Sequence, residues 1–173
     1  MTERLASPDQ TREIIQHMSY QIDIGGDNGS WALLKRLTAE TNEQVEVDEI
    51  GQKMMFMPGF IVSKEIKKIS VVKLTPQELG INHYVNGSIL LSAARLFGLD
   101  NCPVETGPYA CLKDLNGVDT YIIGMTPICM GEGGGSVLEV SRQGNRRVLK
   151  AVLAPLSGSR SYDPTTSVLF RVI

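Results

Sequence analysis

Several residue types that mark particular classes of protein are scarce in this chain of 173 residues. The three cysteines, Cys102, Cys111 and Cys129, are an odd number and have no C-x-x-C spacing, so neither a disulfide framework nor a cysteine zinc site is expected. The only histidines are His17 and His83, and no local signature pairs either of them with a cysteine as base and nucleophile. We therefore predict no metal site and no catalytic residues, and the sequence favours a protein that is not an enzyme.

An excess of positive charge is also lacking. The 17 Lys and Arg residues are balanced by 19 Asp and Glu residues, which gives a net charge of −2 and no electrostatic footprint for nucleic acid or anionic lipid. No apolar run approaches the roughly 20 residues of a membrane helix, and the N-terminus lacks the basic and apolar pattern of a signal peptide. Three unpaired thiols suit a reducing compartment. We predict a cytoplasmic protein without a cofactor, a membrane span or a nucleic-acid partner.

What is present is an ordinary globular composition, with 42% hydrophobic and 21% charged residues. A chain of this length buries roughly 70% of its unfolded surface, and no repeat or linker divides it. We predict a single α+β domain over residues 1–173, with residues 1–7 outside its ordered part. Helices and strands mix in the N-terminal part, and a largely antiparallel sheet forms the C-terminal part.

Capping residues and hydrophobic periodicity locate the expected elements. Helices are predicted to begin at Ser7-Pro8-Asp9-Gln10 and Thr75-Pro76-Gln77-Glu78, and to cover 31–37, 89–99 and 109–115. A strand is the alternative over 31–37. Strands are predicted at 18–24, 44–50, 53–63, 66–74, 120–125, 137–142, 146–153 and 167–173. Gln143-Gly144-Asn145 predicts a tight hairpin between two of these strands.

Two glycine loops, Gly25-Gly26-Asp27-Asn28-Gly29-Ser30 and Gly131-Glu132-Gly133-Gly134-Gly135-Ser136, each follow an apolar run. Glycine-rich backbone can present bare N–H groups to an anion. Residues 22–30 resemble the first phosphate motif of the actin-like ATPase and sugar-kinase superfamily, and residues 133–137 are similar to its second. The resemblance implies a nucleotide- or phosphate-binding enzyme, with Asp23 on the metal side and Gly25, Gly26, Gly134 and Gly135 as the phosphate cradle. The alternative is that both loops are turns that serve backbone geometry.

Methionine and phenylalanine gather in one apolar run that Pro58-Gly59 interrupts. Met54, Met55, Phe56, Met57 and Phe60 form this run, and alternation along a strand would send them to opposite faces. Methionine is flexible and suits adaptable protein contacts, so the outer face is a candidate interface with a partner protein or a second copy. The alternative is a strand that the chain's own helices bury on both sides.

Basic residues cluster around the predicted hairpin. Arg142, Arg146, Arg147 and Lys150 form a candidate binding patch for an acidic partner or an RNA backbone. The alternative is a solvated sheet edge whose charges discourage aggregation.

Reactive residue types are few and apolar β surface is abundant. The leading hypothesis is therefore a non-catalytic assembly or adaptor domain that works through protein–protein contacts, by self-association or by docking on a partner. The phosphate-binding enzyme is the second hypothesis.

Overall fold

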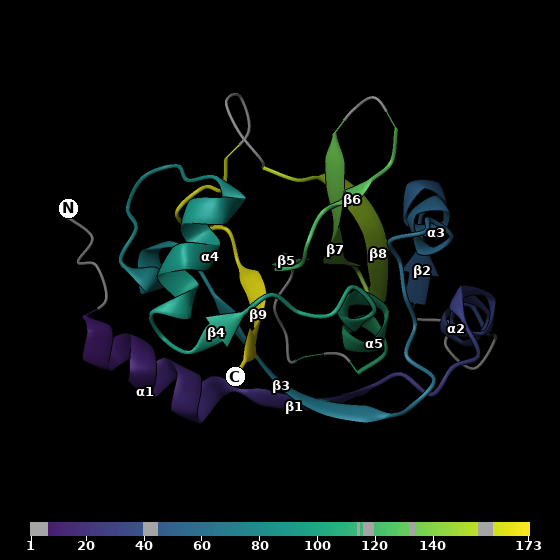
Figure 1. The fold of residues 1–173 in the computed structure, drawn as a ribbon, viewed down its shortest axis with the longest axis horizontal. Helices are drawn as coiled ribbons and strands as arrows, with labels where there is room; N and C mark the ends of the chain where they lie inside the picture. Colours follow the sequence, from purple (N-terminus) through teal and green to yellow (C-terminus); the bar gives the residue numbers. More distant parts are fainter. Residues whose placement is uncertain (1–6, 40–44, 114, 116–119, 132–133, 156–160) are drawn as a thin grey trace.

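The computed structural model describes residues 7–39, 45–113, 115, 120–131, 134–155 and 161–173. Its helices, shown in Figure 1, are α1 (Pro8–Met18), α2 (Ser30–Leu37), α3 (Glu49–Met55), α4 (Gly87–Arg95), α5 (Thr106–Lys113) and the short 3₁₀ helix η2 (Gln77–Leu79). Its strands are β1 (Tyr20–Ile24), β2 (Val45–Val47), β3 (Lys67–Leu74), β4 (Leu99–Asp100), β5 (Thr120–Ile123), β6 (Ile128–Cys129), β7 (Gly135–Gln143), β8 (Arg146–Leu153) and β9 (Val168–Val172). Helices and strands are interspersed as far as α5, and only strands follow it in the described residues, so the α+β fold class is confirmed.

One sheet joins all of these strands, and it is mixed. Its order is β1-β3-β9-β5-β7-β8-β2, with β4 also paired to β9 and β6 to β7. Most pairs are antiparallel, but β5 pairs with β9 and β2 pairs with β8 in parallel. The prediction of a largely antiparallel C-terminal sheet is therefore wrong. The last strand enters the middle of the sheet between β3 and β5, and β2 from the N-terminal half closes the far edge beside β8.

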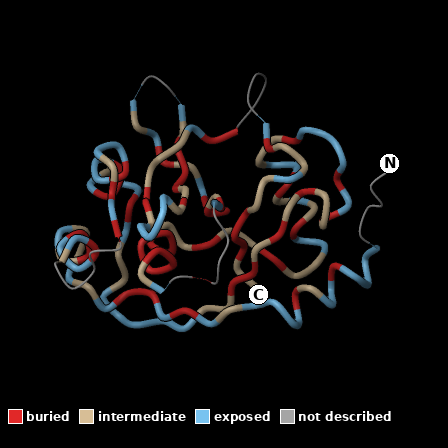
Figure 2. The backbone as a smooth tube through the Cα atoms, turned by 180° about the vertical axis from the view of Figure 1, so that it is seen from behind, coloured by how far each residue is buried: buried red, intermediate tan, exposed pale blue. Residues whose placement is uncertain are grey.

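The strands at the centre of the sheet divide their side chains between two hydrophobic clusters. In β9, Leu169 joins a cluster with α2, α3 and α5, whereas Val168 and Phe170 join a second cluster with α1, η2 and α4. This division follows from the alternation of side chains along a strand. Figure 2 shows buried backbone concentrated along these central strands, with exposed backbone on the outer helices and loops.

The capping hydrogen bonds that the sequence predicts at two helix starts are present in the structure. The Ser7 side chain accepts from the Gln10 N–H while the Gln10 side chain accepts from the Ser7 N–H, so Ser7 is ordered as the N-cap of α1. Thr75 and Glu78 form the same reciprocal pair before η2. The cap predicted at Ser7 is present, and residues 1–6 lie outside the described residues.

The strand predicted over 53–63 is not formed. Residues 49–55 are helical because the Asp48 side chain caps α3 by accepting from the Gly51 N–H at 2.5 Å. Gly51 lies against the backbone of β8, since a Cβ at this position would be 3.0 Å from the Leu149 carbonyl oxygen. The predicted strand over 44–50 is correspondingly limited to Val45–Val47.

None of the helices in the described part of the chain is long and apolar enough to cross a membrane.

Candidate functional site

The first glycine loop connects β1 to α2 and is shaped by close packing. Gly25 and Gly26 have φ values of 85° and 87°. A Cβ on Gly25 would lie 2.2 Å from the Glu65 carbonyl oxygen, and one on Gly26 would lie 2.7 Å from a side-chain carbon of Ile66. The N–H of Gly26 donates to the Ser63 carbonyl at 2.9 Å. Glycine is required here because the neighbouring segment leaves no room for a side chain, and the Gly26 N–H already has a protein partner.

Tyr109 of α5 contacts this loop through its hydroxyl group. The Tyr109 hydroxyl donates to Asp27 Oδ2 at 2.6 Å and lies 3.0 Å from the Gly25 carbonyl oxygen. The Arg36 guanidinium is 3.2 Å from the same carboxylate and 5.7 Å from the centre of the Tyr109 ring. Burial, followed by the Asp27 carboxylate, raises the pKa of Tyr109. Tyr109 therefore stays protonated, and the arrangement fixes the loop rather than activating a nucleophile.

A buried carboxylate anchors the segment that the loop packs against. Glu105 is 2% exposed, and its Oε2 accepts from the Ser63 N–H at 2.9 Å. Ser63 thereby contacts the turn that precedes α5 through its N–H, and the glycine loop through its carbonyl. Sequence reasoning missed Asp27, Arg36, Tyr109 and Glu105 as one cluster, because they come from three segments whose proximity no local pattern shows. The one available signal was Asp27 inside the glycine loop.

The structure does not bring the predicted phosphate-binding parts together. Asp23 is exposed on β1, opposite Lys68 of β3. Gly134 directly precedes β7 and Gly135 is its first residue, and β6 and β7 lie in the upper part of Figure 1. The loop with Gly25 and Gly26 lies between β1 and α2 at the lower right. Residues 132–133 of the second loop lie outside the described residues. No group of three or more His, Cys, Asp or Glu side chains placed to hold a metal ion is found in the described part of the chain.

The four cations of the hairpin do not form one patch. Arg142 and Arg147 are opposite each other in the β7–β8 register, whereas Arg146 and Lys150 fall on the other face of β8. Arg147 donates to the Cys111 and Leu112 carbonyls at 2.5 and 2.9 Å, at the end of α5. Lys150 lies 2.9 Å from Glu139, and Arg146 lies 3.7 Å from Glu46. Arg146, Arg147 and Lys150 thus have partners within the fold.

The methionine-rich run is divided between the core and the surface. Met54 and Met55 are fully buried and Phe60 is 6% exposed, so these three side chains pack within the chain and are not available to a partner. The interface predicted at Met54, Met55 and Phe60 is corrected in this respect, because the helical turn of α3 directs both methionines into the core. Met57 is half-buried against the same core, and Phe56 is 52% exposed.

Phe56 belongs to an apolar surface that we call the corner surface, made of Trp31, Phe56, Ile61 and Ile66. These side chains are 61%, 52%, 70% and 72% exposed. The Trp31 and Phe56 rings have their centroids 6.2 Å apart. Ile66 lies beside Gly26 in the loop that leads into α2, and Ile61 stands on the segment between Phe56 and Ile66. The corner surface therefore joins the start of α2, the end of α3 and the approach to β3.

No family model, no curated protein and no solved structure matches this chain.

Proposed function

We propose that this protein is an adaptor or assembly module that binds a partner protein through the corner surface. The observation that carries the proposal is the Trp31–Phe56 pair, whose ring centroids are 6.2 Å apart and whose side chains are both more than half exposed. Ile61 and Ile66 are exposed on the segment that follows Phe56. Single exposed apolar residues are common on protein surfaces, but clustered ones mark contact sites. Tryptophan and other aromatic anchors contribute most to such contacts.

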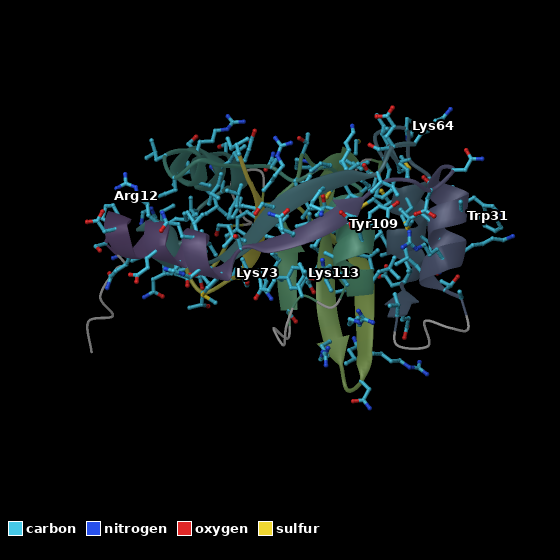
Figure 3. All side chains as sticks on the ribbon, turned by 90° about the horizontal axis from the view of Figure 1, so that it is seen from below. Arg12, Trp31, Lys64, Lys73, Tyr109 and Lys113 are labelled. Atoms are coloured by element: carbon cyan, nitrogen blue, oxygen red, sulfur yellow. The ribbon has the colours of Figure 1, made fainter. Side chains whose placement is uncertain are left out.

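The surroundings of the corner surface favour an acidic partner segment. Lys35 lies 5.8 Å from the Trp31 ring centre. Lys64 and Lys67 are exposed on the segment that carries Ile66, where Glu65 is the intervening acid. Figure 3 shows Trp31 and Lys64 at the same end of the molecule, away from Arg12. A partner segment with aromatic or aliphatic side chains flanked by Asp and Glu would match this surface.

The contacts of Tyr109, Asp27, Arg36 and Glu105, which we call the loop network, support the proposal. They hold the segments that carry the corner surface in place before a partner binds. Tyr109, Asp27 and Arg36 fix the turn that leads into Trp31, and Glu105 fixes the segment that leads to Ile66. A surface held in place before binding loses less conformational entropy when a partner docks. The same network accounts for the glycine loop without any phosphate.

Selection from a random peptide library on the purified protein tests the proposal. We expect enriched peptides to carry an apolar anchor with flanking acidic residues. Binding of a labelled peptide, followed by fluorescence anisotropy, should weaken by about 30-fold in Trp31→Ala, the loss of a binding hot spot of about 2 kcal/mol. Since Trp31 is the only tryptophan, its own emission should also change on binding to the unmodified protein.

The matched control is Leu96→Ala, because Leu96 is 80% exposed but follows α4, which Figure 1 places on the other side of the molecule. Peptide affinity should stay within about twofold in this variant. Light scattering at high concentration determines whether the occupant is a second copy, in which case Trp31→Ala dissociates it. A monomer that enriches no peptide, or a peptide that binds Trp31→Ala as well as the unmodified protein, contradicts the proposal.

A further inference from the structure

A cavity of about 210 Å³ lies where the two hydrophobic clusters meet, far along the sheet from the corner surface. Its walls come from the first turn of α4, the segment that follows β5, the end of β8 and β9. Met125 and Val137 belong to one cluster, and Leu90, Val168 and Phe170 belong to the other. Ser88 and Thr126, both exposed, stand at its rim.

Among the described residues that line this cavity, none has a charged side chain. An ion placed inside would lose its hydration without gaining a counter-charge, which is strongly unfavourable. The walls therefore select for an uncharged occupant with a mainly apolar body. An engineered apolar cavity of about 150 Å³ accommodates benzene, so a volume of this size suits one ring with a small substituent.

The side chain of Tyr162 brings a hydroxyl group to the lining of this cavity. Tyr162 is 7% exposed and lines the cavity. The Tyr162 ring packs against Gly87 at the start of α4. A Cβ added to Gly87 would lie 3.7 Å from ring carbon Cε2, which is next to the carbon that bears the hydroxyl. Within the described residues its hydroxyl makes no hydrogen bond. Burial raises the pKa of Tyr162 to about 12, so the hydroxyl remains a hydrogen-bond donor at neutral pH.

We propose that this cavity binds an uncharged small molecule, of one ring or an equally short chain, whose single carbonyl or hydroxyl oxygen accepts from the Tyr162 hydroxyl. Apolar walls with one or two placed polar groups are the usual composition of a small-molecule site. The site is separate from the corner surface and does not depend on the proposed function.

Three probes of similar size test the inference by ligand-observed NMR and calorimetry on the full chain. Acetophenone supplies a ring and a carbonyl oxygen, toluene supplies the ring alone, and benzoate supplies a charge. We expect acetophenone to bind with a dissociation constant of about 1 mM or lower, toluene to bind more weakly, and benzoate not to bind. Tyr162→Phe should weaken acetophenone by about tenfold and leave toluene unchanged, because it removes the hydroxyl and keeps the ring.

Leu91→Trp, which enlarges a half-buried side chain of the lining, should abolish binding of acetophenone and toluene, whereas Leu96→Trp near the end of the same helix should not. Thermal melting of each variant establishes that it is folded. Absence of acetophenone binding to the unmodified protein overturns the inference, as does benzoate binding as tightly as acetophenone. An equal loss of toluene and acetophenone in Tyr162→Phe overturns the role of the hydroxyl. None of these outcomes bears on peptide binding at the corner surface.

Discussion

At the residue scale, the turn at Gly25 depends on a close approach of two backbones. Gly25→Ala combines a positive φ with a Cβ placed 2.2 Å from the Glu65 carbonyl oxygen. We expect it to lower the free energy of unfolding by about 3 kcal/mol or more, measured by urea denaturation. Gly80→Ala is the matched control, because Gly80 has a similar φ of 83° with nothing within 4 Å, and should cost about 1 kcal/mol. Equal losses would contradict a close approach at Gly25.

The three thiols differ in exposure to solvent, and we therefore expect them to differ in reactivity. Cys102 and Cys111 are buried, and burial raises the pKa of Cys102 to about 12, whereas Cys129 is exposed. A disulfide reagent at pH 8 should therefore modify Cys129 rapidly in the native protein, and the other two only after denaturation. Cys129→Ser should remove the rapid phase. A second rapid thiol in that variant would contradict the burial of Cys102 and Cys111.

At the element scale, the hairpin contributes to the fold through Arg147. Its guanidinium binds the carbonyls at the end of α5, which have no partner within the helix. We expect Arg147→Met to lower the free energy of unfolding by about 2 kcal/mol. Arg146→Met, which removes only a 3.7 Å surface contact with Glu46, should cost less than about 1 kcal/mol. The comparison is made by thermal and urea denaturation, and similar effects of the two substitutions would show that Arg147 does not support α5.

Element prediction succeeded where a local signal was sufficient. The reciprocal caps at Ser7 and Gln10 and the turn at Gly144 depend on residues close in sequence, and both are present in the structure. It failed at residues 53–63 because two adjacent buried methionines fit a buried strand as well as a helix. Asp48 three residues before Gly51 was the signal for the helix, and its capping role was overlooked.

At the scale of the whole molecule, β9 links the two hydrophobic clusters through consecutive residues. If the chain is one domain, as its sequence predicts, damage to either cluster should shift a single unfolding transition. Leu169→Ala should cost about 3 kcal/mol and Phe170→Leu about 1–2 kcal/mol. Trp31 fluorescence, which reports from the side of the first cluster, and far-ultraviolet circular dichroism should give coincident curves in both variants. Separate transitions in Phe170→Leu would contradict a single domain.

The candidate surface was predicted in part. Phe56 was named as an interface residue and is exposed, but Trp31, Ile61 and Ile66 were not named. Apolar spacing alone places Trp31 on the same side of the helix as Leu33, Leu34 and Leu37. The structure buries the three leucines and leaves Trp31 61% exposed at the start of α2. Exposure is set by neighbouring elements, which the spacing of apolar residues does not specify.

The sequence by itself determined the α+β class, the caps of α1 and η2, the β7–β8 hairpin and the lack of a cysteine framework. Each depends on composition or on residues within a few positions of one another, where local hydrogen bonds and side-chain periodicity act. Only the tertiary structure decided that the last strand lies at the centre of the sheet, that the two glycine loops lie apart, and that Tyr109 reaches Asp27. These features depend on contacts between distant segments, whose geometry is fixed when the whole sheet and its two clusters pack together.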